Sequence, residues 1–201
     1  GFTMSGYPVR SLFSFDFQGL NEDGVPTFIN ESGQVTTSDI YFQEYNEKSH
    51  LVYEGSIDPT VTGSFGNVFT YKNFKLNVFM TYAFGNVIRL DPVFKSSYSD
   101  LAAMPKEFKN RWTVQGDELI TNVPVIADKR LLNNDPYLSY AYNAYNYSTE
   151  RVAKGDFIRM KEISLTYDFP AKLIQPLKLS ALSLKLQATN LFLIYSDKKL
   201  N

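Results

Sequence analysis

The sequence has no cysteine, one histidine and one tryptophan among its 201 residues. Without cysteine, the chain can form neither a disulfide framework nor a thiolate metal site. Any histidine-based metal site or catalytic triad would have to be built on His50 alone, and a histidine in a loop is usually an ordinary loop residue. The sequence also contains no glycine-rich phosphate loop and no G-x-S-x-G nucleophile motif. We therefore expect no enzyme activity, no cofactor and no metal site.

Charge and hydropathy exclude two further classes of protein. Twenty basic and 21 acidic residues give a net charge of −1 without a basic block, so the chain lacks the electrostatic footprint of a nucleic-acid-binding protein. No apolar run approaches the roughly 18 to 20 residues that a membrane helix needs. If the chain meets a bilayer, it must do so as a β-barrel. Aromatic residues make up 15% of the chain, mostly Tyr and Phe, which favours strands.

Alternation with period two is the main pattern in the sequence, and in a strand it sends neighbouring side chains to opposite faces. The even positions from 74 to 84 are all apolar, whereas the odd positions include Lys75, Asn77 and Thr81. Similar alternation occurs at 61–71, 163–169 and 182–189. The apolar positions of 74–84 are Phe74, Leu76, Val78, Met80, Tyr82 and Phe84. These runs predict an all-β fold.

The connections between these runs alternate between short and long. Lys72-Asn73 leaves room only for a tight hairpin turn, whereas about 70 residues, 86–155, separate the second long run from the third. Outer-membrane barrels have short periplasmic turns, long extracellular loops and aromatic rings near the strand ends. We therefore predict antiparallel transmembrane strands and an extracellular loop at about 86–155. A soluble β-sandwich or jelly roll is the alternative, because it shows the same alternation.

A shorter alternating run lies near the start of the chain. Phe13, Phe15 and Phe17 alternate with polar residues, and the turn-forming stretch 21–24 and a return arm at 25–29 follow. This pair could be part of the barrel wall or a hairpin in a loop. The turn at 21–24 also offers oxygen ligands suited to calcium, as does 133–136, but neither has the spacing of an EF-hand, so turn formation is the better interpretation. A short helix at 98–109, interrupted by Pro105, is also expected.

Several segments resemble one family, the SusC/RagA-type TonB-dependent outer-membrane transporters. The segments occur in the family's order and cover most of the chain. They are 6–9 (GYPV), 55–67 (GSIDPTVTGSFGN), 69–74 (FTYKNF), 110–113 (NRWT), 151–170 (RVAKGDFIRMKEISLTYDFP) and 188–192 (ATNLF).

The resemblance implies that 1–201 is a fragment of one barrel domain and holds late strands of a 22-stranded barrel. The plug, the early strands and the last strand would lie outside it. The resemblance further implies an importer of glycans or oligopeptides in the outer membrane of a Gram-negative bacterium. Its partners would be TonB, through parts absent here, a SusD-like surface lipoprotein that covers the barrel as a lid, and outer-membrane lipid. A passive carbohydrate-binding or adhesin-type β-domain is the alternative function.

The long loop carries the candidate binding residues. Aromatic rings stack on sugars and also form contacts at protein interfaces, because they present a large rigid surface. The candidates for contact with a ligand or partner are Trp112, Tyr137, Tyr140 and Tyr142. The alternative is that these rings pack the loop on itself, together with Tyr145 and Tyr147.

Overall fold

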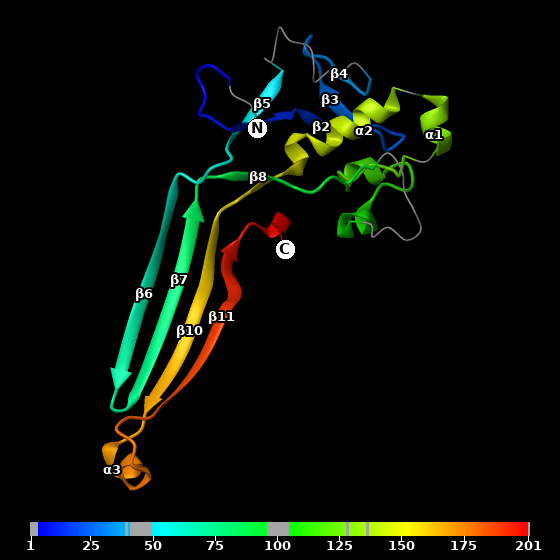
Figure 1. Cartoon of the computed structure of the whole chain (residues 1–201). Helices are drawn as coiled ribbons and strands as arrows, with labels where there is room; N and C mark the ends of the chain where they lie inside the picture. Colours follow the sequence, from blue (N-terminus) through cyan, green and yellow to red (C-terminus); the bar gives the residue numbers. More distant parts are fainter. Residues whose placement is uncertain are drawn as a thin grey trace. The chain divides into compact units, whose positions relative to one another are not determined.

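A computed structural model of the chain describes residues 4–38, 40, 50–95, 105–127, 129–135 and 137–200 (Figure 1). The chain forms two compact units. The first unit comprises Gly1–Ile57 and Val87–Ala153, and the second comprises Asp58–Asn86 and Lys154–Asn201. Within the described ranges, no helix has the length and apolar character needed to cross a membrane.

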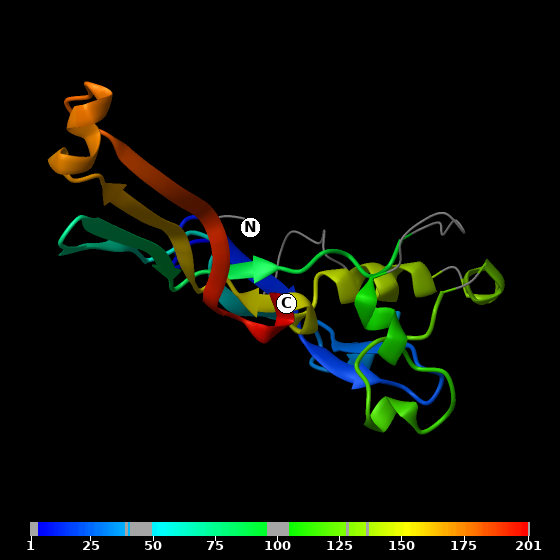
Figure 2. The same ribbon diagram turned by 90° about the horizontal axis from the view of Figure 1, so that it is seen from below.

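The second unit is an antiparallel sheet of four long strands in the order β11-β10-β7-β6 (Figures 1 and 2). Lys72 and Asn73 form the predicted tight turn between β6 and β7, and the backbone of Lys72 is left-handed, at φ 52°. After β10 the chain forms two short helices, and after β11 a third. The strands are β6 (Val61–Tyr71), β7 (Phe74–Phe84), β10 (Phe157–Asp168) and β11 (Ser183–Ser196), and the helices are α3 (Ala171–Ile174), η4 (Gln175–Leu177) and η5 (Lys198–Leu200).

The register of this sheet places the apolar positions of all four strands on one face. Leu76 of β7 lies opposite Phe69 of β6 and Leu165 of β10, and Leu165 in turn lies opposite Leu186 of β11. The next row along the sheet consists of Tyr71, Phe74, Tyr167 and Leu184. Because cross-strand partners share a face, the alternations seen separately in the sequence form one continuous apolar surface.

A bulge in β10 keeps this surface continuous over the whole strand. Met160 pairs with Met80 and Glu162 pairs with Phe79, so Lys161 is an extra residue. One inserted residue reverses which positions face the apolar side. Both Met160 and Ile163 therefore reach the apolar face, although their positions differ in parity. The alternation identified only the part of β10 beyond the bulge, and the structure extends the strand back to Phe157.

The first unit consists of small sheets and short helices. Two pairs of strands and one three-stranded sheet form its β-structure. The strands are β1 (Ser11–Phe15) with β5 (Leu51–Ser56), β8 (Val87–Arg89) with β9 (Val152–Lys154), and β2 (Phe17–Leu20) with β3 (Pro26–Ile29) and β4 (Val35–Thr36). The helices are η1 (Lys106–Asn110), η2 (Asp117–Leu119), α1 (Lys129–Asn134), α2 (Leu138–Asn146) and η3 (Thr149–Arg151).

The run from Phe13 to Phe17 is two strands instead of one. The chain breaks at Asp16, so β1 pairs with β5 while β2 forms a hairpin with β3 around the predicted turn at 21–24. Both strands belong to the first unit and do not join the four-stranded sheet. Of the helix expected at 98–109, only η1 is described, because 98–104 lie outside the described residues.

The first unit has a hydrophobic core, and α2 contributes much of it. Phe15 and Phe28 from the strands pack in the same cluster as Val93, Tyr142 and Tyr145. All five side chains are at most 2% exposed. The segment 86–155 is therefore not a structureless connection, because much of it folds onto the N-terminal strands around a shared core.

Candidate functional site

Helix α2 distributes its tyrosines over two faces. Tyr142 and Tyr145 are three residues apart and buried, at 2% and 1% exposure, whereas Tyr137 and Tyr140 are 59% and 51% exposed. Residues three apart share one face of a helix, so each pair acts together. The rings of Tyr137 and Tyr140 have centroids 6.4 Å apart and are inclined by 27°. Tyr137 and Tyr140 therefore form an exposed aromatic pair at the start of α2.

Tyr142 is a correction to the candidates that the sequence suggested. Its hydroxyl donates a hydrogen bond of 2.7 Å to the carbonyl oxygen of Val125, and its ring centroid lies 5.2 Å from that of Phe94. At 2% exposure the ring has no surface left for a ligand, so it fills the core. Tyr145 is buried in the same core, and its burial raises the pKa of its hydroxyl well above the usual tyrosine value. The sequence alone does not separate these two buried tyrosines from the exposed Tyr137 and Tyr140, because their exposure depends on where α2 begins.

Trp112 lies against the turn between β2 and β3. A Cβ atom added to Gly24 would come within 2.6 Å of Trp112 Cγ, so only glycine fits under the indole ring. The backbone N–H of Trp112 donates to the carbonyl oxygen of Val123 at 2.9 Å, and that of Val125 donates to Gly24 at 3.0 Å. The turn between β2 and β3 therefore covers one side of the Trp112 ring.

Two carboxylates hold the loop that carries Trp112. Asp117 Oδ2 accepts hydrogen bonds from the backbone N–H of Thr113 at 2.9 Å and of Val114 at 3.1 Å, and from the Thr113 hydroxyl at 2.8 Å. These bonds, with the Thr113 backbone first, hold the pKa of Asp117 below its usual range. Glu118 Oε2 accepts from Trp112 Nε1 at 3.0 Å, and this bond lowers the pKa of Glu118. The indole is therefore oriented by its own loop.

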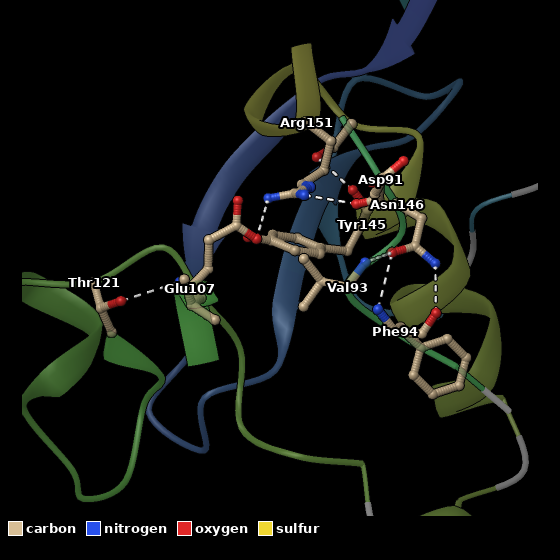
Figure 3. A network of polar contacts seen from close by, with 10 residues as sticks. Asp91, Val93, Phe94, Glu107, Thr121, Tyr145, Asn146 and Arg151 are labelled. Carbon is tan, nitrogen blue, oxygen red and sulfur yellow. Dashed lines mark hydrogen bonds and ion pairs between the residues drawn. The ribbon is translucent and has the colours of Figure 1, made fainter. Parts of the chain in front are cut away.

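An ion pair between the buried Arg151 side chain and Glu107, whose side chain is 38% exposed, connects η1 to the chain around α2 (Figure 3). The Arg151 side chain is 5% exposed, and its Nη1 lies 2.9 Å from Glu107 Oε2. Arg151 Nη2 also donates to the carbonyl oxygen of Asp91 at 2.7 Å. Because a buried guanidinium needs partners, these contacts fix both neighbouring segments in the first unit.

A second set of contacts in the same network holds the segment after β8 (Figure 3). Asn146 Oδ1 accepts from the backbone N–H groups of Val93 and Phe94 at 2.9 and 3.0 Å, and its Nδ2 donates to Phe94 at 3.0 Å. One side chain thus satisfies three backbone groups that no strand partner serves.

His50 and the stretch 21–24 have structural roles, whereas position 136 of the stretch 133–136 lies outside the described residues. Asn21 Oδ1 accepts hydrogen bonds from the backbone N–H groups of Asp23 and Val25, at 3.0 and 2.8 Å, so turn formation explains the stretch 21–24. The His50 side chain is 5% exposed, and its ring centroid lies 6.2 Å from that of Phe15. Among the described residues, no three His, Cys, Asp or Glu side chains come together in a way that could hold a metal ion.

The comparison with curated proteins gives a match to a receptor. The chain is 28% identical over 167 residues to the TonB-dependent receptor P39 of Formosa agariphila. The resemblance to TonB-dependent receptors is confirmed. The match covers 77% of this chain but only 15% of that receptor. No protein-family model matches the chain.

Solved structures agree on the fold of this TonB-receptor-like chain. A structure of the RagAB peptide transporter superposes with a TM-score of 0.63 at 19% identity, covering 92% of this chain and 19% of that one. The RagAB peptide importer in its open-open state gives a TM-score of 0.63 at 20% identity over 94% of this chain and 19% of that one. The chain therefore has the fold of about a fifth of such a transporter. These relatives are named as a receptor and transporters, not as enzymes.

Proposed function

We propose that this chain forms late wall strands and an extracellular loop of a TonB-dependent importer in the outer membrane of a Gram-negative bacterium. The single apolar face across β6, β7, β10 and β11 is the observation that carries the proposal. In water, so large an apolar surface favours aggregation, whereas in a bilayer it is the stable outer face of a barrel.

The opposite face of the sheet supports this orientation. Lys75 Nζ lies 2.8 Å from Asp168 Oδ2, and Asn77 Nδ2 donates to Glu162 Oε1 at 3.1 Å. A row of charged and amide groups is costly in hydrocarbon but is readily hydrated in a polar lumen. The two faces thus favour lipid outside and water inside.

The edges of the sheet support the proposal that the chain is one part of a larger barrel. β6 and β11 each pair on one side only among the described residues. Backbone groups left unpaired within a bilayer cost several kcal/mol each, so a spanning sheet must close on itself. Further strands of the same protein would pair with these edges, in a barrel of about 22 strands.

The loop at 86–155 would then lie outside the cell, because the short turn at Lys72 and Asn73 suits the periplasmic side and one strand crossing follows it. There it would meet a SusD-like lipoprotein lid or the cargo beneath the lid. Tyr137 and Tyr140 are the candidates that the exposure of their rings supports, and Trp112 contributes the uncovered side of its indole. The names of the relatives support an oligopeptide as cargo, and a glycan is the second candidate.

The test is an uptake assay with the full-length protein and its lipoprotein in a Gram-negative host. Labelled oligopeptides and oligosaccharides are offered to cells with and without functional TonB. The proposal predicts import of one class of cargo that stops when TonB is lost. Surface binding that is equal in both strains, without import, would instead support the passive carbohydrate-binding or adhesin-type domain.

The lid contact has its own test in the same cells. Tyr137→Ala combined with Tyr140→Ala should reduce co-purification of the lipoprotein or binding of the cargo, and Trp112→Ala should do so to a smaller degree. Leu119→Ala is the control, because this side chain is 85% exposed in the same unit without an aromatic ring. Unchanged co-purification and binding in an assembled barrel would show that these rings only pack the loop.

A further inference from the structure

One end of the apolar face contains a hollow. Its volume is about 340 Å³, within the roughly 300 to 1,000 Å³ that small-molecule sites occupy. It is lined only by apolar and aromatic side chains, from three strands: Phe74, Leu165, Tyr167, Leu184 and Leu186. Tyr167 lies opposite both Phe74 and Leu184, so the hollow belongs to the last rows of the sheet.

Aromatic rings and α3 close off the same end of the sheet. The Tyr167 ring centroid lies 4.7 Å from that of Phe74 and 4.9 Å from that of Phe169, which directly precedes the N-cap of α3. Both views show α3 at this end, beyond β10 and β11 (Figures 1 and 2). Ile174 holds the helix in place by its burial, at 4% exposure, while Leu173 and Leu177 are 60% and 64% exposed. The connecting segment therefore carries exposed apolar side chains of its own.

Charge at this end is strongly positive. The segments 71–75 and 168–183 contain four lysines and a single aspartate, Asp168, which is paired with Lys75. Lys72, Lys172 and Lys178 are exposed. The opposite end of the sheet differs, since the segments 58–61, 84–86, 154–157 and 196–200 hold three aspartates and three lysines. The end of the sheet that holds the hollow therefore carries a net positive charge, whereas the charges of the other end balance.

We propose that this end of the sheet binds an anionic glycerophospholipid. One acyl chain lies in the hollow, and Lys172 and Lys178 hold the phosphate of the headgroup. The site rests on the proposed function, because it requires the apolar face to meet a bilayer. The turn at Lys72 and Asn73 is at this same end, so the site belongs to the periplasmic leaflet, which in Gram-negative outer membranes consists of glycerophospholipid.

The chemistry of the rim favours this occupant over other apolar ligands. An acyl chain needs an apolar trough, which the five lining residues provide, since the Tyr167 hydroxyl is the one polar group among their side chains. Long lysine side chains near a membrane interface extend their ammonium groups to the headgroups while their methylene stems cover apolar surface. Tyr167 and Phe74 match the aromatic rings that mark the interface.

The experiment uses the full-length receptor, purified in mild detergent and reconstituted in nanodiscs containing phosphatidylglycerol. After delipidation, native mass spectrometry measures the phosphatidylglycerol that remains bound. Each lysine near an anionic surface contributes about fivefold to affinity, so Lys172→Gln with Lys178→Gln should lower retention by about 25-fold. Leu186→Trp, which fills the hollow, should also displace the lipid.

Matched controls come from the same sheet. Lys198→Gln with Lys199→Gln removes two lysines at the other end, and Phe65→Trp enlarges a residue of the apolar face that is 57% exposed and outside the hollow. Both should retain the lipid as the unaltered protein does. Equal retention in all variants, equal loss in the controls, or co-purification of lipid A in place of phosphatidylglycerol would overturn the site. Heat-modifiable mobility of the barrel is measured in parallel: an assembled barrel without bound lipid contradicts only the lipid site, whereas a protein that never assembles in membranes contradicts the proposed function as well.

Discussion

The two units of the chain use aromatic residues in opposite ways. In the first unit, Phe15, Phe28, Tyr142 and Tyr145 are at most 2% exposed. In the second unit, the described buried hydrophobic residues are only Ala83 and Ile174, while Phe65 is 57% exposed. The difference shows that the first unit carries its own core, whereas the second is a single layer whose apolar face needs an apolar environment from elsewhere.

The largest expected effect is a difference in stability cost between the two units when an aromatic residue is replaced by alanine. Tyr145→Ala removes a fully buried ring from the first unit and should cost about 3 to 5 kcal/mol of local stability. Phe69→Ala removes a ring that is 56% exposed in the sheet and leaves no cavity, so it should cost only the transfer of the ring from water to lipid, about 1.5 to 3 kcal/mol. Hydrogen exchange of the full-length protein in membranes measures both. Equal costs would break the comparison, because they would mean that the sheet has a core of its own.

Ion pairs provide the second comparison. Arg151→Ala leaves Glu107, which is 38% exposed, and the Asp91 carbonyl without the buried guanidinium, and should cost about 1 to 3 kcal/mol in the first unit. Lys75→Ala breaks a pair whose side chains are 53% and 40% exposed, and should cost about 0 to 1 kcal/mol. Pulse proteolysis of the assembled protein reports on the first unit. A loss below about 1 kcal/mol for Arg151→Ala would show that the network of Figure 3 is dispensable.

The packing of Trp112 on Gly24 gives a smaller effect with a close control. Gly24 and Gly33 both have left-handed backbones, at φ +73° and +74°, but an added Cβ at Gly33 meets nothing within 4 Å. Gly33→Ala therefore measures the cost of backbone strain alone. Gly24→Ala adds the clash with the indole, which should lower the stability by about a further 1 to 3 kcal/mol. Trp112→Ala should abolish this difference. A difference that persists without the indole would place the clash elsewhere.

The smallest expected effect is a pH dependence of the loop that carries Trp112. The pKa of Asp117 is depressed in the folded state, so its hydrogen bonds stabilise the loop fully above the unfolded value of about 3.9 and progressively less as pH falls through the folded value. Hydrogen exchange at Thr113 and Val114 should therefore accelerate below about pH 4, after correction for intrinsic exchange. In Asp117→Asn this acceleration should be absent, and protection should be low at every pH.

The sequence predicted the sheet well and the first unit poorly, for physical reasons. A strand with one apolar face shows an alternation of apolar and polar residues in its sequence. This pattern located β6, β7 and their two-residue turn residue by residue. The bulge at Lys161 interrupts that alternation, which hid the first half of β10. The first unit is held by single contacts between distant segments, such as Asn146 with Phe94, and no local pattern encodes those.

The candidate residues illustrate the same limit. All four were chosen because aromatic rings form binding surfaces, but burial depends on helix phase and on the partner across the core. Tyr137 and Tyr140 remain candidates because they are exposed, and Tyr142 fills the core. One side of the Trp112 ring is covered by Gly24. A helical spacing of three between Tyr142 and Tyr145 was the one available signal that these two share a face.

The claim that the apolar face of the sheet meets lipid is tested most directly by cysteine labelling of neighbouring positions in β7. Val78 and Asn77 are adjacent and therefore point to opposite faces. In cells carrying the full-length protein, Val78→Cys should be protected from a membrane-impermeant thiol reagent, whereas Asn77→Cys should react through the hydrated lumen. Strong labelling of Val78→Cys together with protection of Asn77→Cys would contradict the account.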